Sequence, residues 1–487
     1  MTIRQVIIQA GGRGTRLEDL TRNRPKCLVP IDGKPLLYHT FDAFPGASFT
    51  VIVDYRGEVV RRYLDAFPPG VPVRVVEAGG DGTCGGIARA AAGLDQDEPV
   101  AVVWSDLVFD QQQVFRLSPL QFSVGLTRDF ACRVVMQGMG VFGLFAVARA
   151  ASLQETPKSG EFAEWACDRC DGFCIVEGVR EYGTAQALRD HWNAKPSARW
   201  FNDIKIGMNY VEKTARTPLF QPLIDDERAW YREAERRGFT RVPMVIPWDD
   251  GLMTSRVVGR NLYDASPEPQ ILEDAMNVLD TLHALSSAPT DRRACREMYA
   301  DKPAARLSHI PRLAPDYALR DTIRVNGRAC RNPLRHPYML TDLLNDLIPD
   351  AFAFIHGDAT FSNMMIDGAD KVWLIDPRGR FGHVQYYGDP AYDWAKLWYS
   401  VAGGYDQFNR KRFVLSMDGD VTIEIAPSGW EHLAPVMAER IGEPMMRRVR
   451  VLHGLIWLSL SGYATDCYDA MLGAWFKGMY ELEGALA

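Results

Sequence analysis

The sequence predicts two domains: an N-terminal α/β domain with a mostly parallel sheet, and a C-terminal α+β domain that is mainly helical. Three observations support this. The chain has 487 residues, several times the ~100–150 residues of a typical domain. Its first part alternates continuous Val/Ile runs with helical patterns, as buried parallel strands and their crossover helices do. The pattern then changes, and Lys195, Pro196 and Ser197 are typical of a linker. We therefore predict domains at 1–195 and 196–487.

The elements of the first domain follow from short apolar runs, which fit buried strands, and from amphipathic segments, which fit helices. Strands are expected at 6–10, 49–54, 73–77 and 100–104, and helices at 36–44, 58–66 and 86–93. The strands are continuous in Val and Ile rather than alternating, so both faces of the sheet should be covered by helices. We therefore expect a Rossmann-like domain.

The second domain begins with a predicted hairpin and a charged helix, and then becomes mainly helical. The hairpin strands are expected at 201–206 and 210–213, and the helix at 226–237. Short strands interrupt the helical pattern within 352–376. The apolar run at 451–460 contains His453 and is shorter than the ~18 residues that span a bilayer. We interpret this run as a buried helix.

Composition and charge exclude several classes of protein. The sequence is 47% hydrophobic and 24% charged, which excludes a disordered or fibrous chain. Its net charge of −7 argues against nucleic acid as a partner, although small anionic ligands need only a local cluster of donors. No apolar stretch is long enough to predict a membrane span, and the first residues lack the apolar core of a secretory signal.

The nine cysteines are odd in number and scattered, which favours reduced thiols in a cytoplasmic enzyme. Cys167, Cys170 and Cys174 are clustered, but no fourth ligand with zinc-finger spacing follows them. Buried thiols are the simpler interpretation of this cluster, and a metal site is the alternative. The sequence does not fix the oligomeric state, and a homo-oligomer is left open.

A glycine-rich turn comes directly after the first predicted strand. It reads GGRGTRL from Gly11 to Leu17, and glycines in such a turn let backbone N–H groups approach a phosphate closely. Pro25 and Lys26 follow a short distance beyond Arg16. Arg16 and Lys26 would supply two cations to one anionic site, for which a purely structural turn has no use.

The run GGRGTRLEDLTRNRPKCLVPIDGKPLLYH resembles the signature of the nucleotidyltransferase family that makes nucleotide sugars and related activated alcohols. The resemblance implies that a phosphate ester attacks the α-phosphorus of an NTP (CTP, UTP, GTP or dTTP) and releases pyrophosphate. It assigns Arg16 and Lys26 to the phosphates and Asp106 to Mg²⁺. The residues that it assigns to nucleotide binding are Gly11, Gly12, Gly14 and Thr15 in the first turn, with Gly82 and Thr83 in the base-binding loop.

By the same resemblance, a second metal ligand is expected at Glu181. The family often has an Asp just before a Gly–Thr pair, and Glu181 stands in the corresponding stretch, ahead of Gly183 and Thr184. Glutamate still offers hard oxygen ligands to Mg²⁺, although its extra methylene moves the carboxylate. The alternative is a surface glutamate that holds no metal.

Three oxygen-bearing side chains are expected to converge at one end of a hairpin in the second domain. Two short apolar strands joined by a polar turn predict the hairpin. Asn363 begins its first strand and Asp376 ends its second, so both lie at its open end. Asp358 precedes Asn363 on the loop that leads to the same end. Two of these side chains are suited to Mg²⁺, and the third can orient a hydroxyl.

The spacing of His356, Asp358, Asn363 and Asp376 resembles the catalytic loop of the aminoglycoside phosphotransferase and choline kinase group, whose fold is a protein-kinase-like α+β domain. The resemblance implies that Asp358 is the catalytic base, that Asn363 and Asp376 hold Mg²⁺, and that His356 shapes the loop. ATP would be the phosphoryl donor.

Other parts of the second domain match this family less fully. Lys213 is expected to bind the ATP phosphates and Glu227 to pair with it, with Glu233 as a competing partner. A glycine-rich phosphate loop of the protein-kinase type is missing from the sequence. Asp389 and Asp393 resemble the family's next segment, although Asp389 would equally serve as a helix cap.

Together the two resemblances predict a bifunctional enzyme. The C-terminal domain would phosphorylate a small sugar, polyol or amino alcohol, and the N-terminal domain would join that phosphate to a nucleotide, giving an activated precursor for surface polysaccharide. Two alternatives are left open: one domain is a silent ligand sensor or scaffold, or the chain is an antibiotic-modifying kinase. Trp394, Trp398 and Tyr399 would line an acceptor pocket or, at helical spacing, pack in the core.

Overall fold

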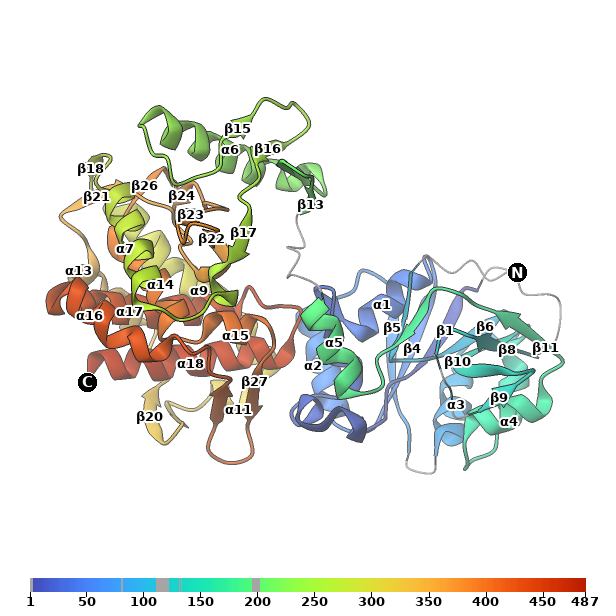
Figure 1. Cartoon of the computed structure of the whole chain (residues 1–487). Helices are drawn as coiled ribbons and strands as arrows, with labels where there is room; N and C mark the ends of the chain where they lie inside the picture. Colours follow the sequence, from blue (N-terminus) through green and yellow to red (C-terminus); the bar gives the residue numbers. More distant parts are fainter. Residues whose placement is uncertain (1–2, 80–81, 111–121, 131, 133, 195–201) are drawn as a thin grey trace. The chain divides into compact units, whose positions relative to one another are not determined.

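The strands expected from the Val/Ile runs form a single sheet in the N-terminal part of the chain (Figure 1). In this computed structural model, the described residues are 3–79, 82–110, 122–130, 132, 134–194 and 202–487. The chain divides into two units, Met1–Ala194 with Thr465–Asp469, and Lys195–Ala464 with Ala470–Ala487. The expected linker at 195–197 lies outside the described residues.

The sheet of the N-terminal unit is mostly parallel, as predicted. Its strands are β1 (Gln5–Gln9), β4 (Ser48–Val53), β5 (Val73–Glu77), β6 (Val100–Trp104), β8 (Phe122–Thr127), β10 (Met139–Val147) and β11 (Gly172–Ile175). They lie side by side in the order β11-β8-β10-β6-β1-β4-β5. β1 is parallel to β4 and β6, and β4 is parallel to β5, whereas β10 is antiparallel to β6 and β8.

Helices cover the sheet because its strands are apolar on both faces. Three predicted helices are present, α1 (Leu36–Ala43), α2 (Gly57–Ala66) and α3 (Thr83–Ala91), and α4 (Phe162–Arg169) and α5 (Ala185–Ala194) follow. Ile87 of α3 and Phe162 of α4 are fully buried in one core with Ile7 and Val102 of the sheet. A second, smaller cluster buries Leu17 and Leu188. The Rossmann-like architecture therefore follows from the apolar pattern.

The order of the parallel strands places a ligand-binding edge between β1 and β6. From β1 the chain winds outward through β4 to β5 and then returns to the other side of β1 as β6. In open α/β sheets, ligands bind beyond the carboxyl ends of the strands at such a reversal. The glycine-rich turn follows β1 and Asp106 follows β6, and Gln9 and Trp104 at the ends of these strands are register partners. The two motifs therefore lie at the same edge.

A separate two-stranded ladder brings Glu181 to this edge. β7 (Leu107–Phe109) pairs antiparallel with β12 (Val179–Glu181), so that Leu107 lies opposite Glu181. The N–H of Tyr182 donates to the carbonyl of Asp106 at 2.9 Å. Two carboxylates that lie far apart in the sequence are thereby held next to each other.

The C-terminal unit combines a small sheet with a larger helical body, as expected for the α+β class. The small sheet contains β13 (Asn202–Ile206), β14 (Tyr210–Ala215), β16 (Leu252–Ser255) and β15 (Val245–Ile246) in that order. Helix α6 (Gln221–Arg236) begins five residues before the predicted 226–237 helix, with Pro222 in its first turn. The predicted hairpin strands are β22 (Met364–Asp367) and β23 (Val372–Leu374).

The helical body is built around long buried helices. They are α7 (Pro269–His283), α14 (Pro390–Val401), α17 (Glu443–Ser461) and α18 (Tyr468–Leu486). The apolar run around His453 lies within α17 and is buried, as expected. Across the described ranges, we find no helix with the length and apolar character needed to cross a membrane.

Glycines let α17 and α18 approach each other closely. A Cβ atom on Gly478 of α18 would lie 2.6 Å from the backbone nitrogen of Leu458 in α17. A Cβ atom on Gly454 of α17 would likewise lie 2.8 Å from the backbone nitrogen of Leu482. Because both obstacles are backbone atoms, no rotamer change can relieve the overlap, and the helices would have to separate.

We expect Gly478→Ala to destabilise the C-terminal unit by about 1–3 kcal/mol, because overpacking outweighs the higher helix propensity of alanine. Thermal unfolding of the full chain followed by circular dichroism measures the effect. The matched control is Gly368→Ala in the turn between β22 and β23, where a Cβ would meet nothing within 4 Å. Equal melting temperatures for the two variants would contradict the close packing of α17 and α18.

Candidate functional site

Three glycines of the turn after β1 have different structural roles. Gly14 has a left-handed φ of 63°, and a Cβ there would lie 3.2 Å from Cβ of Lys26. A Cβ on Gly11 would lie 3.1 Å from Cβ of Asp54. A Cβ on Gly12, by contrast, would meet nothing within 4 Å, and Gly12 is exposed, as is Thr15. Glycine thus avoids a tight contact at Gly11 and suits the left-handed backbone at Gly14, whereas at Gly12 it leaves open space where a phosphate can approach the backbone.

Charged side chains gather beside this turn in two pairs. Lys26 forms an ion pair with Asp106, and both side chains are largely buried. Arg16 is 64% exposed and places a guanidinium nitrogen 3.6 Å from a carboxylate oxygen of Glu181. Burial and the nearby Asp106 carboxylate raise the pKa of Glu181, while Lys26 and Arg16 oppose that shift. The predicted cations and carboxylates therefore form one cluster.

The two carboxylates fit a hard divalent cation. Asp106 and Glu181 offer oxygen ligands at the ligand-binding edge of the sheet, and the like-charge interaction between them is of the kind that a cation relieves. The described residues contain no group of three or more His, Cys, Asp or Glu that could hold a metal ion. Mg²⁺ commonly takes one or two carboxylates and completes its shell with waters and substrate phosphates. Asp106 and Glu181 would hold the ion in this manner.

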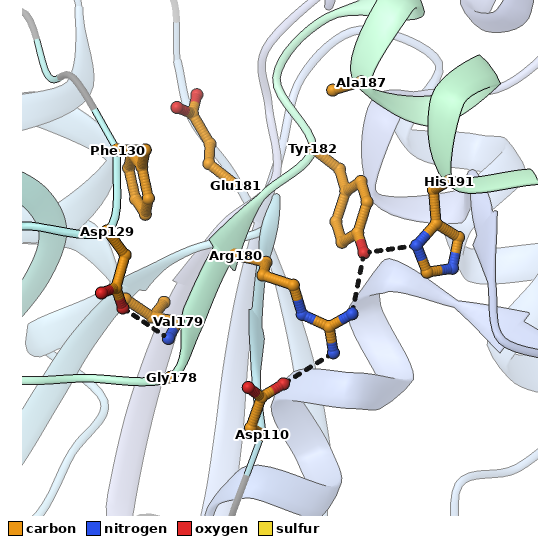
Figure 2. A pocket seen from close by; sticks show the side chains of 10 residues that line it. All are labelled: Asp110, Asp129, Phe130, Gly178, Val179, Arg180, Glu181, Tyr182, Ala187 and His191. Carbon is orange, nitrogen blue, oxygen red and sulfur yellow. Dashed lines mark hydrogen bonds and ion pairs between the residues drawn. The ribbon is translucent and has the colours of Figure 1, made fainter. Parts of the chain in front are cut away.

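An open pocket with a volume of about 470 Å³ adjoins Glu181 (Figure 2). Arg180 donates to the hydroxyl of Tyr182 at 3.3 Å and to Asp110 at 2.7 Å, and the same hydroxyl contacts Nδ1 of His191 at 2.9 Å. In Figure 2 the carboxylate of Glu181 points away from Arg180, as alternation along β12 requires. The lining residues are Asp110, Asp129, Phe130, Gly178, Val179, Arg180, Glu181, Tyr182, Ala187 and His191.

The expected base-binding loop has structural contacts of its own. Gly82 has a left-handed φ of 84°, and a Cβ there would lie 2.6 Å from the carbonyl oxygen of Gly160. The hydroxyl of Thr83 donates to Glu161 at 3.0 Å and accepts the N–H of Phe162 at 2.7 Å. Gly82 and Thr83 thus fasten the start of α3, at the carboxyl side of the sheet, to the segment that leads into α4.

In the C-terminal unit, Lys213 is the centre of a buried ionic network. It lies on β14 and is 4% exposed. Its Nζ donates to the two carboxylate oxygens of Glu227 on α6 at 2.7 and 2.9 Å, and to Asp376 at 2.6 Å. Glu233, the competing partner, instead pairs with Arg236 and Arg237. The contacts of Lys213 therefore join the small sheet, α6 and the end of the β22–β23 hairpin.

Asp358, Asn363 and Asp376 meet at the open end of that hairpin. The side-chain amide of Asn363 donates to Asp358 Oδ2 at 3.0 Å and to the Asp358 carbonyl at 2.7 Å. The N–H of Ile375 donates to the carbonyl of Asn363 at 2.9 Å, which ties the two ends of the hairpin together. Asp376 has a left-handed φ of 55°, a costly conformation for a non-glycine residue that is frequent at functional sites.

His356 is buried and stabilises the loop that carries Asp358 through two hydrogen bonds. Its Nε2 donates to the carbonyl of Ile375 at 2.9 Å, and its Nδ1 accepts the N–H of Asp358 at 3.2 Å. Burial lowers the pKa of His356, in agreement with the neutral ring that these contacts require. His356 thus connects the residue before Asp376 to Asp358 itself.

Two residues of α14 support Asp358 and were not identified as such from the sequence. The carboxylate of Asp393 is fully buried and accepts the N–H groups of His356 at 2.8 Å and Gly357 at 2.7 Å. Lys396, one helical turn later, places its Nζ 2.9 Å from Asp358 Oδ1. Asp389 caps α14 by accepting the N–H of Ala391 at 2.9 Å, which agrees with the simpler of its two interpretations. The sequence signal for the role of Asp393 was the resemblance of this segment to the kinase family, and no such signal pointed to Lys396.

We expect Asp393→Asn to lower kcat for phosphoryl transfer by about 10–100-fold and to destabilise the unit by about 2–4 kcal/mol. The amide is neutral and has only one acceptor oxygen, so both backbone N–H groups lose a charged acceptor and one of them faces an NH2 donor instead. The matched control is Asp389→Asn, which alters a buried carboxylate on the same helix that does not contact the loop. A comparable loss of stability in both variants, with kcat reduced only for Asp393→Asn, identifies Asp393 as a positioning residue. Equal kcat values would contradict this assignment.

Two of the remaining candidates pack in the core. Trp394 and Tyr399 are buried, and Tyr399 stacks on Tyr405 with ring centroids 4.3 Å apart. The packing interpretation of the α14 aromatic residues therefore holds for these two. The nine cysteines, all of which lie in the described ranges, form no disulfide; Cys167, Cys170 and Cys174 are only partly buried, and the thiol of Cys170 donates to the carbonyl of Cys167 at 3.2 Å.

Two family models match the chain. A model described as a MobA-like NTP transferase domain matches residues 6–159, and a model described as the phosphotransferase enzyme family matches residues 192–414. Both resemblances inferred from the motifs are confirmed at the level of these domain families.

Curated relatives match over shorter stretches. The UTP–glucose-1-phosphate uridylyltransferase of Haloferax volcanii is 42% identical over 72 residues, which are 14% of this chain and 30% of the relative. The catalytic subunit beta of mannose-1-phosphate guanylyltransferase from Dictyostelium discoideum is 31% identical over 112 residues, 22% of this chain and 31% of the relative. The chain thus spans about a third of the length of these relatives. Among solved structures, the CTP:phosphocholine cytidylyltransferase from Streptococcus pneumoniae is 20% identical, with a TM-score of 0.32 over 40% of this chain and 100% of that chain.

Proposed function

We propose that this chain, which joins an NTP transferase domain to a phosphotransferase domain, catalyses two consecutive reactions. The C-terminal domain transfers the γ-phosphoryl group of ATP to a hydroxyl of a small sugar or related alcohol. The N-terminal domain transfers a nucleotidyl group from an NTP to the resulting phosphate ester and releases pyrophosphate. The observation that carries the proposal is that a carboxylate and cation cluster is assembled in each unit, at the end of β6 and at the end of the β22–β23 hairpin.

For the kinase reaction, Asp358 accepts the proton of the attacking hydroxyl as that oxygen bonds to the γ-phosphorus. Lys213 orients the ATP phosphates, and Glu227 fixes the position of Lys213. Asn363 and Asp376 would hold Mg²⁺, which supplies positive charge at the transferred phosphoryl group. The amide of Asn363 also keeps the Asp358 carboxylate in place through their 3.0 Å hydrogen bond.

For nucleotidyl transfer, the acceptor phosphate is already an anion at neutral pH, so no general base is required. The backbone at Gly11, Gly12, Gly14 and Thr15 receives the NTP phosphates, while Arg16 and Lys26 stabilise the charge that develops at the α-phosphorus. Asp106 and Glu181 would hold Mg²⁺ at the same phosphates. We place the base near Gly82 and Thr83, and the phosphate ester in the pocket beside Glu181.

The two reactions form a sequence because the first makes the kind of ester that the second consumes. The names of two relatives specify sugar 1-phosphates as acceptors. By analogy, the kinase domain would phosphorylate the anomeric hydroxyl of a sugar, and the product would be a nucleotide-activated precursor for surface polysaccharide. Both reactions would take place in the cytoplasm, where ATP and the other NTPs are available.

Mass spectrometry of reaction mixtures tests the proposal. The full chain is incubated with ATP, Mg²⁺, all four NTPs and a panel of sugars, sugar acids, polyols and amino alcohols. We expect one nucleotide-linked product that appears only when ATP, a second NTP and one acceptor are present together. The assignment of both domains would be refuted if no acceptor of the panel is phosphorylated by ATP and if supplied sugar 1-phosphates release no pyrophosphate from any NTP.

A further inference from the structure

Two lysines, Lys302 and Lys396, act electrostatically on Asp358, the proposed base of the kinase reaction, and two arginines lie close to Lys302. Lys396 pairs with Asp358 at 2.9 Å. Burial lowers the pKa of Lys302 well below its usual value, the neighbouring Arg378, Lys396 and Arg306 add to that shift, and the Asp358 carboxylate opposes it. Arg378 is two residues beyond Asp376, and its Cβ faces Gly357, next to Asp358. We call Lys302, Arg306, Arg378 and Lys396 the Asp358 cation cluster.

Among the described residues, acidic groups offset only part of this positive charge. The acidic group that acts most strongly on Lys302 and on Lys396 is the single carboxylate of Asp358. Arg306 donates to the neutral carbonyl of Gly462 at 2.9 Å. Within the part of the chain that the structure describes, the side chains of Lys302 and Arg378 form no hydrogen bond or ion pair. Gathering like charges at partly buried positions is unfavourable unless an anion joins them.

The local fold keeps two of these cations on one face. Lys302 and Arg306 are one helical turn apart on α9 (Lys302–Arg306). A π-helical segment, Glu297–Asp301, directly precedes α9. Such segments are rare and occur often at functional sites, because they rotate the residues that follow them. Both lysines approach the ring of Tyr392, with Nζ of Lys302 at 5.9 Å and Nζ of Lys396 at 5.8 Å from its centroid.

The nucleotide phosphates have a different set of partners. Lys213 reaches Asp376 from β14 of the small sheet, and Asn363 and Asp376 are the proposed metal ligands. The cation cluster instead comes from α9, α14 and the loop after Asp376, and it is centred on Asp358. Because the hydroxyl to be phosphorylated must lie against Asp358, the acceptor would lie beside Lys396 and Lys302. A cationic amino alcohol would be repelled there.

From this arrangement, and resting on the kinase function proposed above, we infer that the acceptor is an anionic alcohol, one that carries a carboxylate or phosphate close to the hydroxyl that receives the phosphoryl group. Lys302 and Arg378 pair with that anionic group. The hydroxyl proton passes to Asp358, a bond forms between the hydroxyl oxygen and the γ-phosphorus, and the bond from the γ-phosphorus to the bridging oxygen breaks to leave ADP. The product carries both the original anion and the new phosphate.

Matched acceptors of different charge test this inference. The assay measures the transfer of ³²P from labelled ATP to two series of acceptors. The first series is glycerol, glycerate and glycerol 3-phosphate, and the second is glucose, glucuronate, glucose 6-phosphate and glucosamine. We expect at least one anionic member to exceed its neutral and cationic counterparts by about tenfold or more in kcat/KM. A neutral or cationic member that is phosphorylated as well as its anionic counterpart would overturn the inference and leave the kinase function intact. No transfer to any acceptor would refute the kinase function as well.

Substitutions test whether the cation cluster binds the anionic group of the acceptor or the phosphates of the nucleotide. Lys302→Gln and Arg378→Gln should each raise KM for the preferred anionic acceptor by about tenfold and shift KM for ATP by less than about twofold. The matched control is Lys371→Gln, at an exposed lysine in the turn of the same unit, which should alter neither constant. If KM for ATP rises instead and the charge preference among acceptors persists, the cluster serves the nucleotide and the inference is wrong.

Discussion

Asp358→Asn is expected to lower phosphoryl transfer from ATP by ~10²–10⁴-fold, the usual contribution of a general base. The substitution preserves the size of the side chain. Its remaining oxygen can still accept the hydrogen bond from the Asn363 amide, which lies 3.0 Å from Asp358 Oδ2 in the unsubstituted protein. An amide cannot, however, take up the proton of the attacking hydroxyl. It also gives up the ion pair with Lys396. Initial rates of ADP formation with the preferred acceptor measure the loss.

The matched control for this variant lies at the other end of the same hairpin. Asp367 accepts the N–H groups of Ala369 and Lys371 at 2.9 and 3.0 Å and is remote from the three converging side chains. Asp367→Asn should therefore retain the kinase rate. Asp358→Asn should also retain pyrophosphate release from an NTP and a supplied sugar phosphate. Loss of both activities in Asp358→Asn would contradict two independent sites, and an unchanged kinase rate would exclude Asp358 as the base.

The convergence of Asp358, Asn363 and Asp376 could be predicted because the chain that joins them is short. Two apolar strands with a polar turn allow only one close pairing, and a hairpin necessarily brings its two ends together. The position of the glycine-rich turn was predictable for a similar reason, because a turn after a buried parallel strand must lie at the carboxyl edge of the sheet. In both cases local sequence determines which residues meet.

The support of Asp358 by α14 could not be predicted in this way. Asp393 and Lys396 reach the loop from more than thirty residues further along the chain. Helical periodicity places them on one face of α14, but it does not say which part of the protein that face meets. Glu181 is a similar case, because its approach to Asp106 depends on the β7–β12 ladder, and neither short strand has a strong sequence pattern.

The choice between Glu227 and Glu233 as the partner of Lys213 also depended on tertiary structure. The two residues are six positions apart, so they lie on different faces of α6. Glu227 is on the buried face, together with Ile224, Trp230 and Tyr231. That face is set by helix-to-sheet packing, in which Trp230 donates its indole N–H to the carbonyl of Ile355 at 2.8 Å. Lys213 then meets the glutamate that shares this face.

Lys26→Ala is expected to reduce nucleotidyl transfer by about 100-fold or more, which is typical for the loss of one preorganised charge at a transferring phosphoryl group. Lys26 is largely buried against Asp106, so its ammonium group is held near the phosphate position before substrate arrives. Its removal would also leave Asp106 and Glu181 without their nearest buried cation, which disfavours binding of an NTP that carries several negative charges. Pyrophosphate release with each of the four NTPs and a supplied sugar 1-phosphate measures the effect.

A second lysine of the same unit provides the control for a general effect of removing positive charge. Lys34 forms an ion pair with Asp42 at the surface of the same unit, and Lys34→Ala should retain the full rate of pyrophosphate release. Lys26→Ala should leave ATP-dependent phosphorylation by the C-terminal domain unchanged, because that reaction depends on Lys213 and Asp358. If Lys26→Ala releases pyrophosphate at the rate of the unsubstituted chain, the Lys26–Asp106 pair only stabilises the fold, and the NTP phosphates bind elsewhere.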